Sequence, residues 1–168
     1  LEKGIGGRPR VARVMPNMPA LLGRGVSVAC PGRYSRRQDL RYVVSIFQRL
    51  GKVLELKERH FDAVTALSGS GPAYVFYFLD ALIKAGVSMG LGQGVARDLA
   101  LETFLGSGEL ARRHKGALSG LIDRVASKGG TTEAALKVFA RSGWDRLIFQ
   151  AVSAAKRRSG ELRGLLTR

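Results

Sequence analysis

The longest apolar stretch of the sequence covers residues 73–85, in which only two residues are charged. Its large side chains do not keep to one stripe of a helix but occupy most of its faces: Tyr74, Val75, Phe76, Tyr77, Phe78, Leu79, Leu82 and Ile83. A helix that is apolar on most faces is buried on most faces. The residues before it, Ser70–Pro72, are typical of a helix start, with Ser70 as the expected cap. The pattern predicts a central helix covered by the rest of this chain or by a partner chain.

Helical spacing continues on both sides of this stretch, and no strand pattern follows residue 60. Apolar residues recur every three or four positions, as one buried helix face requires. The sequence predicts further helices over five ranges: Phe61–Leu67, Val95–His114, Ser119–Ala126, Thr132–Arg141, and Trp144 to about Leu162.

Residues 10–57 have a different pattern. Alternating or β-branched runs predict strands over residues 10–15, 25–30 and 52–57, and helical spacing predicts a helix over residues 35–50. A strand–helix–strand unit usually belongs to a parallel sheet with helices on its faces. One helix cannot cover both faces of such a sheet, so we interpret residues 1–59 as the end of an α/β domain and residues 60–168 as a helical domain.

Composition narrows the possible functions. The 45% hydrophobic and 24% charged residues are typical of an ordinary soluble globular protein. A single cysteine, Cys30, permits no internal disulfide and, with two histidines, makes no metal site at a usual spacing. We therefore expect a cytoplasmic protein with no metal and no membrane contact. The net charge of +15 leaves nucleic-acid binding open, but no stacking aromatics accompany the basic runs, so this function is disfavoured.

A glycine-rich segment between two expected helices is the first candidate for ligand binding. It runs Ser127-Lys128-Gly129-Gly130-Thr131-Thr132. Two glycines let consecutive N–H groups point in one direction, and we expect the two threonines to cap the following helix. Such a segment can bind a small anion such as a carboxylate. The alternative is a plain turn between helices.

A second candidate, Met15-Pro16-Asn17, follows the first expected strand. Ligands of open α/β sheets bind outside the carboxyl ends of the strands, so an Asn between two prolines there is a possible ligand contact. The alternative is again a simple turn. The segment Gly69–Pro72 has neither the dinucleotide glycine spacing nor a Lys-Ser/Thr pair, so we interpret it as a helix start and not as a phosphate loop.

Taken in order, these motifs resemble the pyrroline-5-carboxylate reductase family, whose members make proline. The resemblance rests on five runs that together span nearly the whole chain from Arg13: RVMPNMPALLGRGV at 13–26, IFQRLGKVLEL at 46–56, DAVTALSGSGPAYVFYFLDAL at 62–82, GGTTEAALKVF at 129–139 and AVSAAKRRSGEL at 151–162.

The resemblance implies a mainly α fold. A helical dimerisation domain, of the type at the C-terminus of 6-phosphogluconate dehydrogenase, would follow the last β-α-β part of a Rossmann-type domain. It further implies NADPH or NADH as cofactor, a homodimer or larger homo-oligomer, and reduction of the cyclic imine 1-pyrroline-5-carboxylate to L-proline. By motif match, the substrate would be bound by Ser127, Gly129, Gly130, Thr131 and Thr132, with Thr132 also near the imine nitrogen as the catalytic residue. Met15, Pro16 and Asn17 would line the nicotinamide side.

The chain departs from the family pattern in three places. The family usually has proline at the position of Lys128 and threonine at the position of Met18. No strand–GxGxxG–helix element occurs in the sequence, so the cofactor pyrophosphate has no binding site here, and we expect the chain to be inactive alone. Three alternatives stay open: a non-catalytic dimerisation or regulatory relative, a related imine or 6-phosphogluconate-type reductase with another substrate, and a basic nucleic-acid-binding protein.

Overall fold

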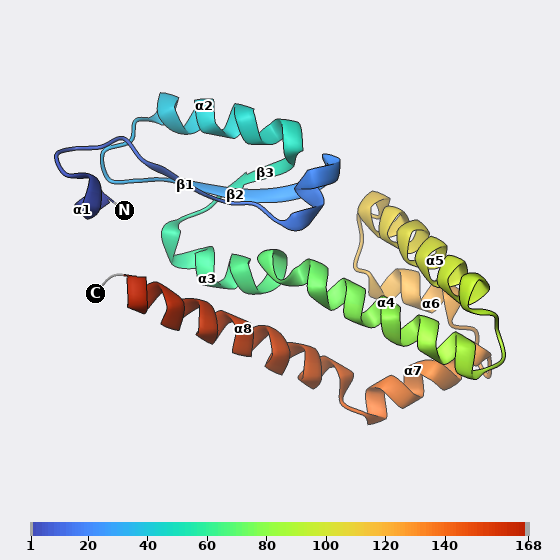
Figure 1. Cartoon of the computed structure of the whole chain (residues 1–168). Helices are drawn as coiled ribbons and strands as arrows, with labels where there is room; N and C mark the ends of the chain where they lie inside the picture. Colours follow the sequence, from blue (N-terminus) through green and yellow to red (C-terminus); the bar gives the residue numbers. More distant parts are fainter. Residues whose placement is uncertain (1, 167–168) are drawn as a thin grey trace. The chain divides into compact units, whose positions relative to one another are not determined.

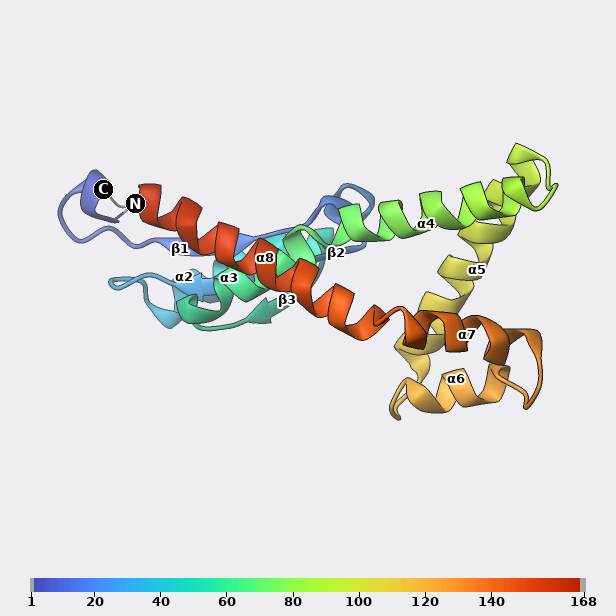
Figure 2. The same cartoon turned by 90° about the horizontal axis from the view of Figure 1, so that it is seen from below.

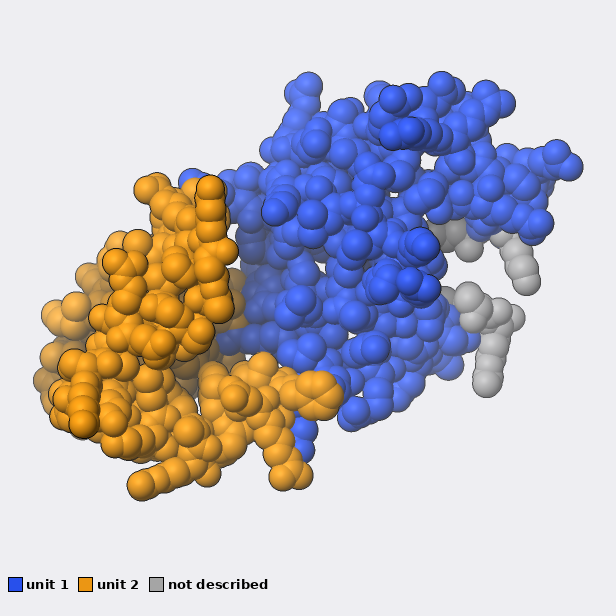
Figure 3. All heavy atoms as spheres, turned by 180° about the vertical axis from the view of Figure 1, so that it is seen from behind, with its two compact units in different colours: residues 1–74, 150–168 blue, residues 75–149 orange. Residues whose placement is uncertain are grey.

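The computed structural model describes residues 2–166. The chain forms two compact units, coloured separately in Figure 3. One contains residues 1–74 and 150–168, and the other contains residues 75–149. We describe each unit by itself.

In the first unit, the described residues form a three-stranded sheet in the order β1 (Ala12–Met15), β2 (Gly25–Pro31), β3 (Gly51–Glu55) (Figure 1). β2 and β3 are parallel and joined by helix α2 (Arg37–Phe47), which confirms the predicted β-α-β unit. β1 runs antiparallel to β2, so the sheet is mixed and not wholly parallel. The connection between these two strands spans nine residues, long enough for a reversal but too short for a crossover helix.

The core of this unit lies on both faces of β2. Four consecutive residues of β2, from Ser27 to Cys30, are almost completely buried. Val28 and Cys30 pack with Phe61, a fully buried residue at the start of α3 (Phe61–Val64). Because side chains alternate along a strand, Ser27 and Ala29 face the opposite side of the sheet. Figure 1 shows α2 and α3 on opposite faces of the sheet, which explains the burial of β2.

The bounds of the other helices are α1 (Glu2–Ile5), α4 (Gly71–Ser88), α5 (Gln93–Arg113), α6 (Ser119–Val125), α7 (Thr131–Arg141) and α8 (Trp144–Leu166). Among these helices, α4 to α8 agree closely with the sequence pattern, whereas the short α1 was not predicted. Short 3₁₀ turns occupy Met18–Leu22, Gln48–Leu50 and Glu58–His60. No helix among residues 2–166 has the length and apolar character that crossing a membrane requires.

The predicted cap at Ser70 is wrong. Ser70 has φ −83° and ψ −18°, which are helical values, whereas an N-cap residue has an extended backbone. A π-helical turn, Thr65–Gly69, links α3 directly to α4, and the Ser70 N–H donates to the Thr65 carbonyl over 2.8 Å. The Ser-Gly-Ser-Gly segment therefore continues a helical path where the sequence pattern indicated an interruption.

The central helix α4 is confirmed, but this chain leaves much of it uncovered. Leu79 and Gly86 are buried, while Tyr77 is 80% and Phe76 is 54% exposed. In the second unit, α4 contacts α5 closely at Gly86, where an added Cβ would lie 3.1 Å from the Ala96 Cβ. Trp144 contacts Phe78 and Phe139, with ring centroids 6.0 Å and 5.4 Å away. Covering by the rest of this chain thus accounts for only part of the predicted burial.

The C-terminal part of α8 is tied to α3 within the first unit, and both Figure 1 and Figure 2 show the two helices side by side. Asp62, whose side chain is 13% exposed, accepts a hydrogen bond from the Ser159 hydroxyl over 3.0 Å. Its second oxygen forms an ion pair with Arg163, also at 3.0 Å. The C-terminal part of α8 therefore belongs to the same compact unit as the sheet.

We expect Gly51→Ala to lower the free energy of unfolding by about 3 kcal/mol or more. Gly51 has φ 138°, and an added Cβ would lie only 2.0 Å from the carbonyl oxygen of Gly25, its partner in the parallel pair. Urea denaturation followed by circular dichroism measures the loss. Gly94→Ala is the matched control, because that position in α5 has open space and should be neutral or slightly stabilised. A loss below about 1 kcal/mol for Gly51→Ala would contradict the close approach of the strands.

Candidate active site

The first candidate segment forms the turn between α6 and α7 in the second unit. Gly129 has φ 74°, in the left-handed region that favours glycine. The Gly130 N–H donates to the Ser127 carbonyl over 3.0 Å. A Cβ added at Gly130 would lie 2.5 Å from the Ser127 hydroxyl oxygen. The backbone of this turn therefore favours glycine at position 129, whereas a larger residue at position 130 would require the exposed Ser127 side chain to move.

The predicted cap of α7 by the threonines is wrong. The N-cap is Gly130, with an extended backbone at φ −81° and ψ 172° and no side-chain cap hydrogen bond. Thr131 and Thr132 occupy the first two helical positions instead. Glycine is an accepted N-cap, which leaves both hydroxyls available for other contacts. The amides of Thr131 and Thr132 belong to the first helical turn, where N–H groups have no partner inside the helix.

A carboxylate already lies at this helix start. Glu133 accepts a hydrogen bond from the Gly129 N–H over 2.5 Å and forms an ion pair with Lys137 at 2.9 Å. The bond to Lys137, followed by that to Gly129, lowers the pKa of the Glu133 carboxyl. The amides of Gly129 and Gly130 are thus engaged within the turn. The donors left for a small anion are the amides and hydroxyls of the two threonines, with Ser127 and Lys128 exposed beside them.

The second candidate segment, Met15–Asn17, lies in the first unit at the end of β1. Met15 packs against the buried cluster around Phe61, and Pro16 is exposed. The Asn17 side chain is held at both ends: its carbonyl oxygen accepts from the Val26 N–H over 2.9 Å, and its amide donates to the Ser68 hydroxyl over 3.4 Å. These side chains shape the loop, and Pro16 is the part of it that faces solvent.

The structure therefore gathers the predicted residues into two groups. Residues 127–132 form one turn in the second unit, and residues 15–17 form one loop in the first. Sequence reasoning missed Ser68, which contacts Asn17 from the π-turn. Ser68 lies between the expected helix Phe61–Leu67 and the expected helix start Gly69–Pro72, and no sequence signal connected it with a loop 51 positions earlier in the chain.

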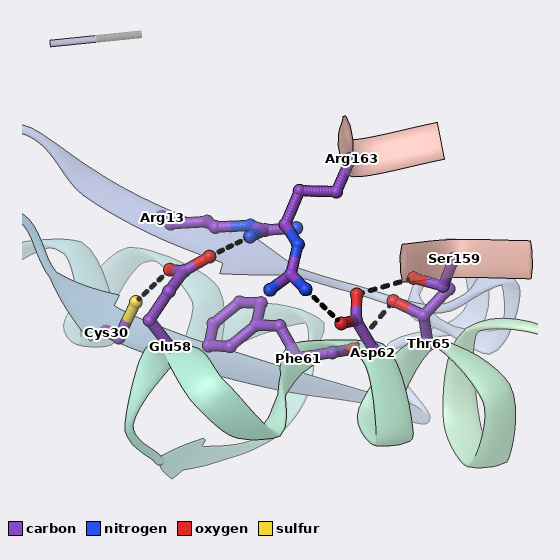
Figure 4. Close-up of polar contacts among 8 residues, drawn as sticks. All are labelled: Arg13, Cys30, Glu58, Phe61, Asp62, Thr65, Ser159 and Arg163. Atoms are coloured by element: carbon purple, nitrogen blue, oxygen red, sulfur yellow. Dashed lines mark hydrogen bonds and ion pairs between the residues drawn. The ribbon is translucent and has the colours of Figure 1, made fainter. Parts of the chain in front are cut away.

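Polar contacts surround Phe61, which packs against the face of β2 that carries Val28 and Cys30 (Figure 4). The Arg13 guanidinium lies 4.6 Å from the Phe61 ring centroid and forms an ion pair with Glu58. The Cys30 thiol donates to the other Glu58 oxygen over 3.1 Å. Burial, followed by this hydrogen bond, raises the pKa of the Cys30 thiol to about 11. Burial together with a raised pKa is typical of a structural cysteine and not of a catalytic nucleophile.

Alkylation of Cys30 is expected to be slow at pH 8, because roughly one thiol in a thousand is ionised there when its pKa is about 11. Glu58→Gln removes the negative charge that opposes thiolate formation, so the apparent pKa should fall. The pH dependence of the iodoacetamide reaction measures it, and Glu161→Gln, an exposed change on α8, is the control. An unchanged pH profile in Glu58→Gln would show that the carboxylate does not act on the thiol.

A model of the family described as "Pyrroline-5-carboxylate reductase dimerisation" matches residues 58–162. The chain is also similar to curated proteins with the name pyrroline-5-carboxylate reductase. The protein of Mycobacterium tuberculosis is 43% identical over 170 residues, covering 91% of this chain and 58% of that protein. The protein of Pisum sativum is 39% identical, covering 93% of this chain and 57% of that protein. The chain thus spans somewhat more than half the length of these relatives.

Solved structures give the same result. The pyrroline carboxylate reductase of Plasmodium falciparum, solved with NADP bound, superposes with a TM-score of 0.89 at 35% identity, covering 94% of this chain and 63% of that one. The pyrroline-5-carboxylate reductase of Coxiella burnetii gives a TM-score of 0.89 at 33% identity, covering 95% and 60%. Both the predicted mainly α fold with its preceding β-α-β segment and the predicted family are confirmed. The chain belongs to the pyrroline-5-carboxylate reductase family.

Proposed function

We propose that the full-length protein containing this chain reduces 1-pyrroline-5-carboxylate to L-proline with NADPH or NADH. The observation that carries the proposal is the turn 127–132, where first-turn amides and two free threonine hydroxyls meet at the start of α7 in a chain of this family. A helix N-terminus has partial positive charge and attracts a carboxylate.

In this proposal the turn binds the substrate carboxylate. Thr131 and Thr132 supply amide and hydroxyl donors, and Ser127 supplies a further hydroxyl. Gly129 and Gly130 contribute backbone shape, because their N–H groups already donate to Glu133 and Ser127. Glu133 would repel a second carboxylate, but its ion pair with Lys137 compensates its charge. Lys128, exposed in the same turn, adds a cation where the family usually has proline.

Thr132 is the proposed catalytic residue, and its hydroxyl would hydrogen-bond the imine nitrogen. Reduction adds a hydride to the carbon of the C=N bond, while the π-electron pair moves to nitrogen, which takes a proton from solvent. A nicotinamide cofactor, when bound, would supply this hydride. The residues of this chain mainly orient the imine, since positioning is the protein's principal contribution to such a reaction.

The residues present fit only part of the cofactor. The loop Met15–Asn17 presents the exposed ring of Pro16 on a backbone held by Asn17, and we propose that it lines the nicotinamide side. The dinucleotide phosphates have no glycine-rich binding turn in these 168 residues. We therefore propose that residues 1–59 are the last part of a Rossmann-type domain and that residues 60–168 are the helical domain.

We further propose that the protein is a homodimer or a larger homo-oligomer. The apolar side chains that α4 leaves exposed in a single chain support this: Phe76, Tyr77, Leu82 and Val87. A second copy would cover apolar surface that water would otherwise contact, which is favourable.

A comparison of two substrates tests the proposed function. Full-length protein is incubated with NADPH or NADH and either 1-pyrroline-5-carboxylate or 1-pyrroline, which has the same imine but no carboxylate. We expect proline to form, with kcat/KM at least about 100-fold higher for the carboxylated imine, because an anion bound by several donors contributes a few kcal/mol. Equal use of both imines would contradict the carboxylate site, and no reduction of either would contradict the reductase.

A further inference from the structure

Two neighbouring residues of the π-turn contact the loop at the end of β1. The Ser68 hydroxyl oxygen lies 3.4 Å from the Asn17 amide nitrogen. At Gly69, an added Cβ would lie 2.7 Å from the Met15 methyl carbon, so Met15 occupies the space that a larger residue would need. The π-turn therefore touches this loop on both sides of Pro16.

The orientation of the Asn17 side chain is determined by its partners. The Val26 N–H can only donate, so the atom 2.9 Å from it must be the carbonyl oxygen of the Asn17 amide. The NH₂ group then faces Ser68, whose hydroxyl oxygen accepts. Removal of either partner would leave one end of the amide without its bond.

The turn that carries Ser68 is itself fixed to the core. The Thr65 hydroxyl donates to the carbonyl of Phe61 over 2.8 Å, and Phe61 is fully buried (Figure 4). The Ser70 N–H closes the wide turn on the Thr65 carbonyl. π-turns insert one residue into a helical path and occur frequently at functional sites.

We propose that Ser68 and Gly69 are positioning residues for the cofactor: through Asn17 and Met15, the π-turn holds the loop around Pro16 in the shape that receives the nicotinamide. The inference rests on the proposed function for its cofactor and on the contacts above for its geometry. It assigns the π-turn a role that the helix-start interpretation of the sequence did not include.

The geometric part is tested on the 168-residue chain without cofactor. In ¹⁵N NMR spectra, Ser68→Ala should shift the Asn17 side-chain NH₂ signals and accelerate exchange of the Val26 amide, because Asn17 loses one of its two supports. Ser68→Thr keeps the hydroxyl and should restore both. Ser45→Ala, the same change at an exposed serine of α2, should alter neither. Asn17 signals that stay unchanged in Ser68→Ala would overturn the inference.

The functional part uses the full-length protein. Ser68→Ala should raise KM for the nicotinamide cofactor about fivefold, the value of one ordinary hydrogen bond, with kcat and the imine KM within about twofold. Ser68→Thr should again restore the parent value. An equal rise in both KM values, or a loss confined to kcat, would overturn the positioning role. If the unsubstituted full-length protein reduces no imine, both the proposed function and the cofactor role are contradicted. The NMR experiment then still decides whether Ser68 holds Asn17.

Discussion

Replacement of Thr132 by alanine in the full-length reductase is expected to lower kcat/KM for 1-pyrroline-5-carboxylate by about 10- to 100-fold, the range for one hydrogen bond to a charged group. The KM for the cofactor should stay within about twofold, since Thr132 is proposed to contact only the substrate. Thr132 occupies the second position of α7, behind a glycine cap, so its hydroxyl is not needed to start the helix. The loss should therefore be functional, with little effect on stability.

Thr132→Ser is the matched variant, because it keeps the hydroxyl and removes only a methyl group. It should retain most of the activity. Steady-state kinetics with each reactant varied in turn separates the two KM values, and urea denaturation checks stability. If Thr132→Ala raises the cofactor KM as much as it lowers substrate use, the carboxylate site is not at this turn.

Replacement of Tyr77 by glutamate is expected to raise the dissociation constant of the oligomer at least about 100-fold, because it removes an aromatic side chain that the proposed interface would bury and places a charge there. Tyr77 is 80% exposed in the single chain, so the substitution leaves intrachain packing nearly unchanged. Sedimentation velocity across a concentration series measures the shift from oligomer to monomer.

Tyr42→Glu is the control for this experiment. Tyr42 is 70% exposed on α2, so it provides the same substitution outside α4. It should leave the oligomer intact. Two results would contradict the proposed role of α4. One is an unsubstituted chain that is already monomeric at micromolar concentration, and the other is a Tyr77→Glu variant that associates as strongly as the unsubstituted chain.

The helices and strands could be predicted well from the sequence, because their signals are local. Apolar spacing located α5 through α8, and the alternating run over residues 52–57 located β3. The dense apolar run of α4 predicted a covered helix, and its exposed Tyr77 shows that the rest of this chain does not supply all of the covering. A pattern of side chains records that a surface needs covering, but not which chain covers it.

The details of the candidate site could not be predicted in the same way. Ser70 and Thr131 have the residue types of helix caps, yet backbone geometry places Ser70 within a helical path and gives the cap of α7 to Gly130. The bond between Asn17 and Ser68 joins residues that are distant in the sequence. Such contacts arise from tertiary packing, for which a single sequence has no periodic signal.

Isotopic labelling of the transferred hydride tests the proposed reduction directly. Full-length protein is supplied with 1-pyrroline-5-carboxylate and nicotinamide cofactor carrying deuterium at the transferable position, and the proline produced is analysed by mass spectrometry and NMR. We expect proline with a single deuterium at Cδ, the former imine carbon, and we expect Thr132→Ala to form it about 10- to 100-fold more slowly when the imine is not saturating. Unlabelled proline, or no proline at saturating cofactor, would contradict the proposed hydride transfer to the imine carbon.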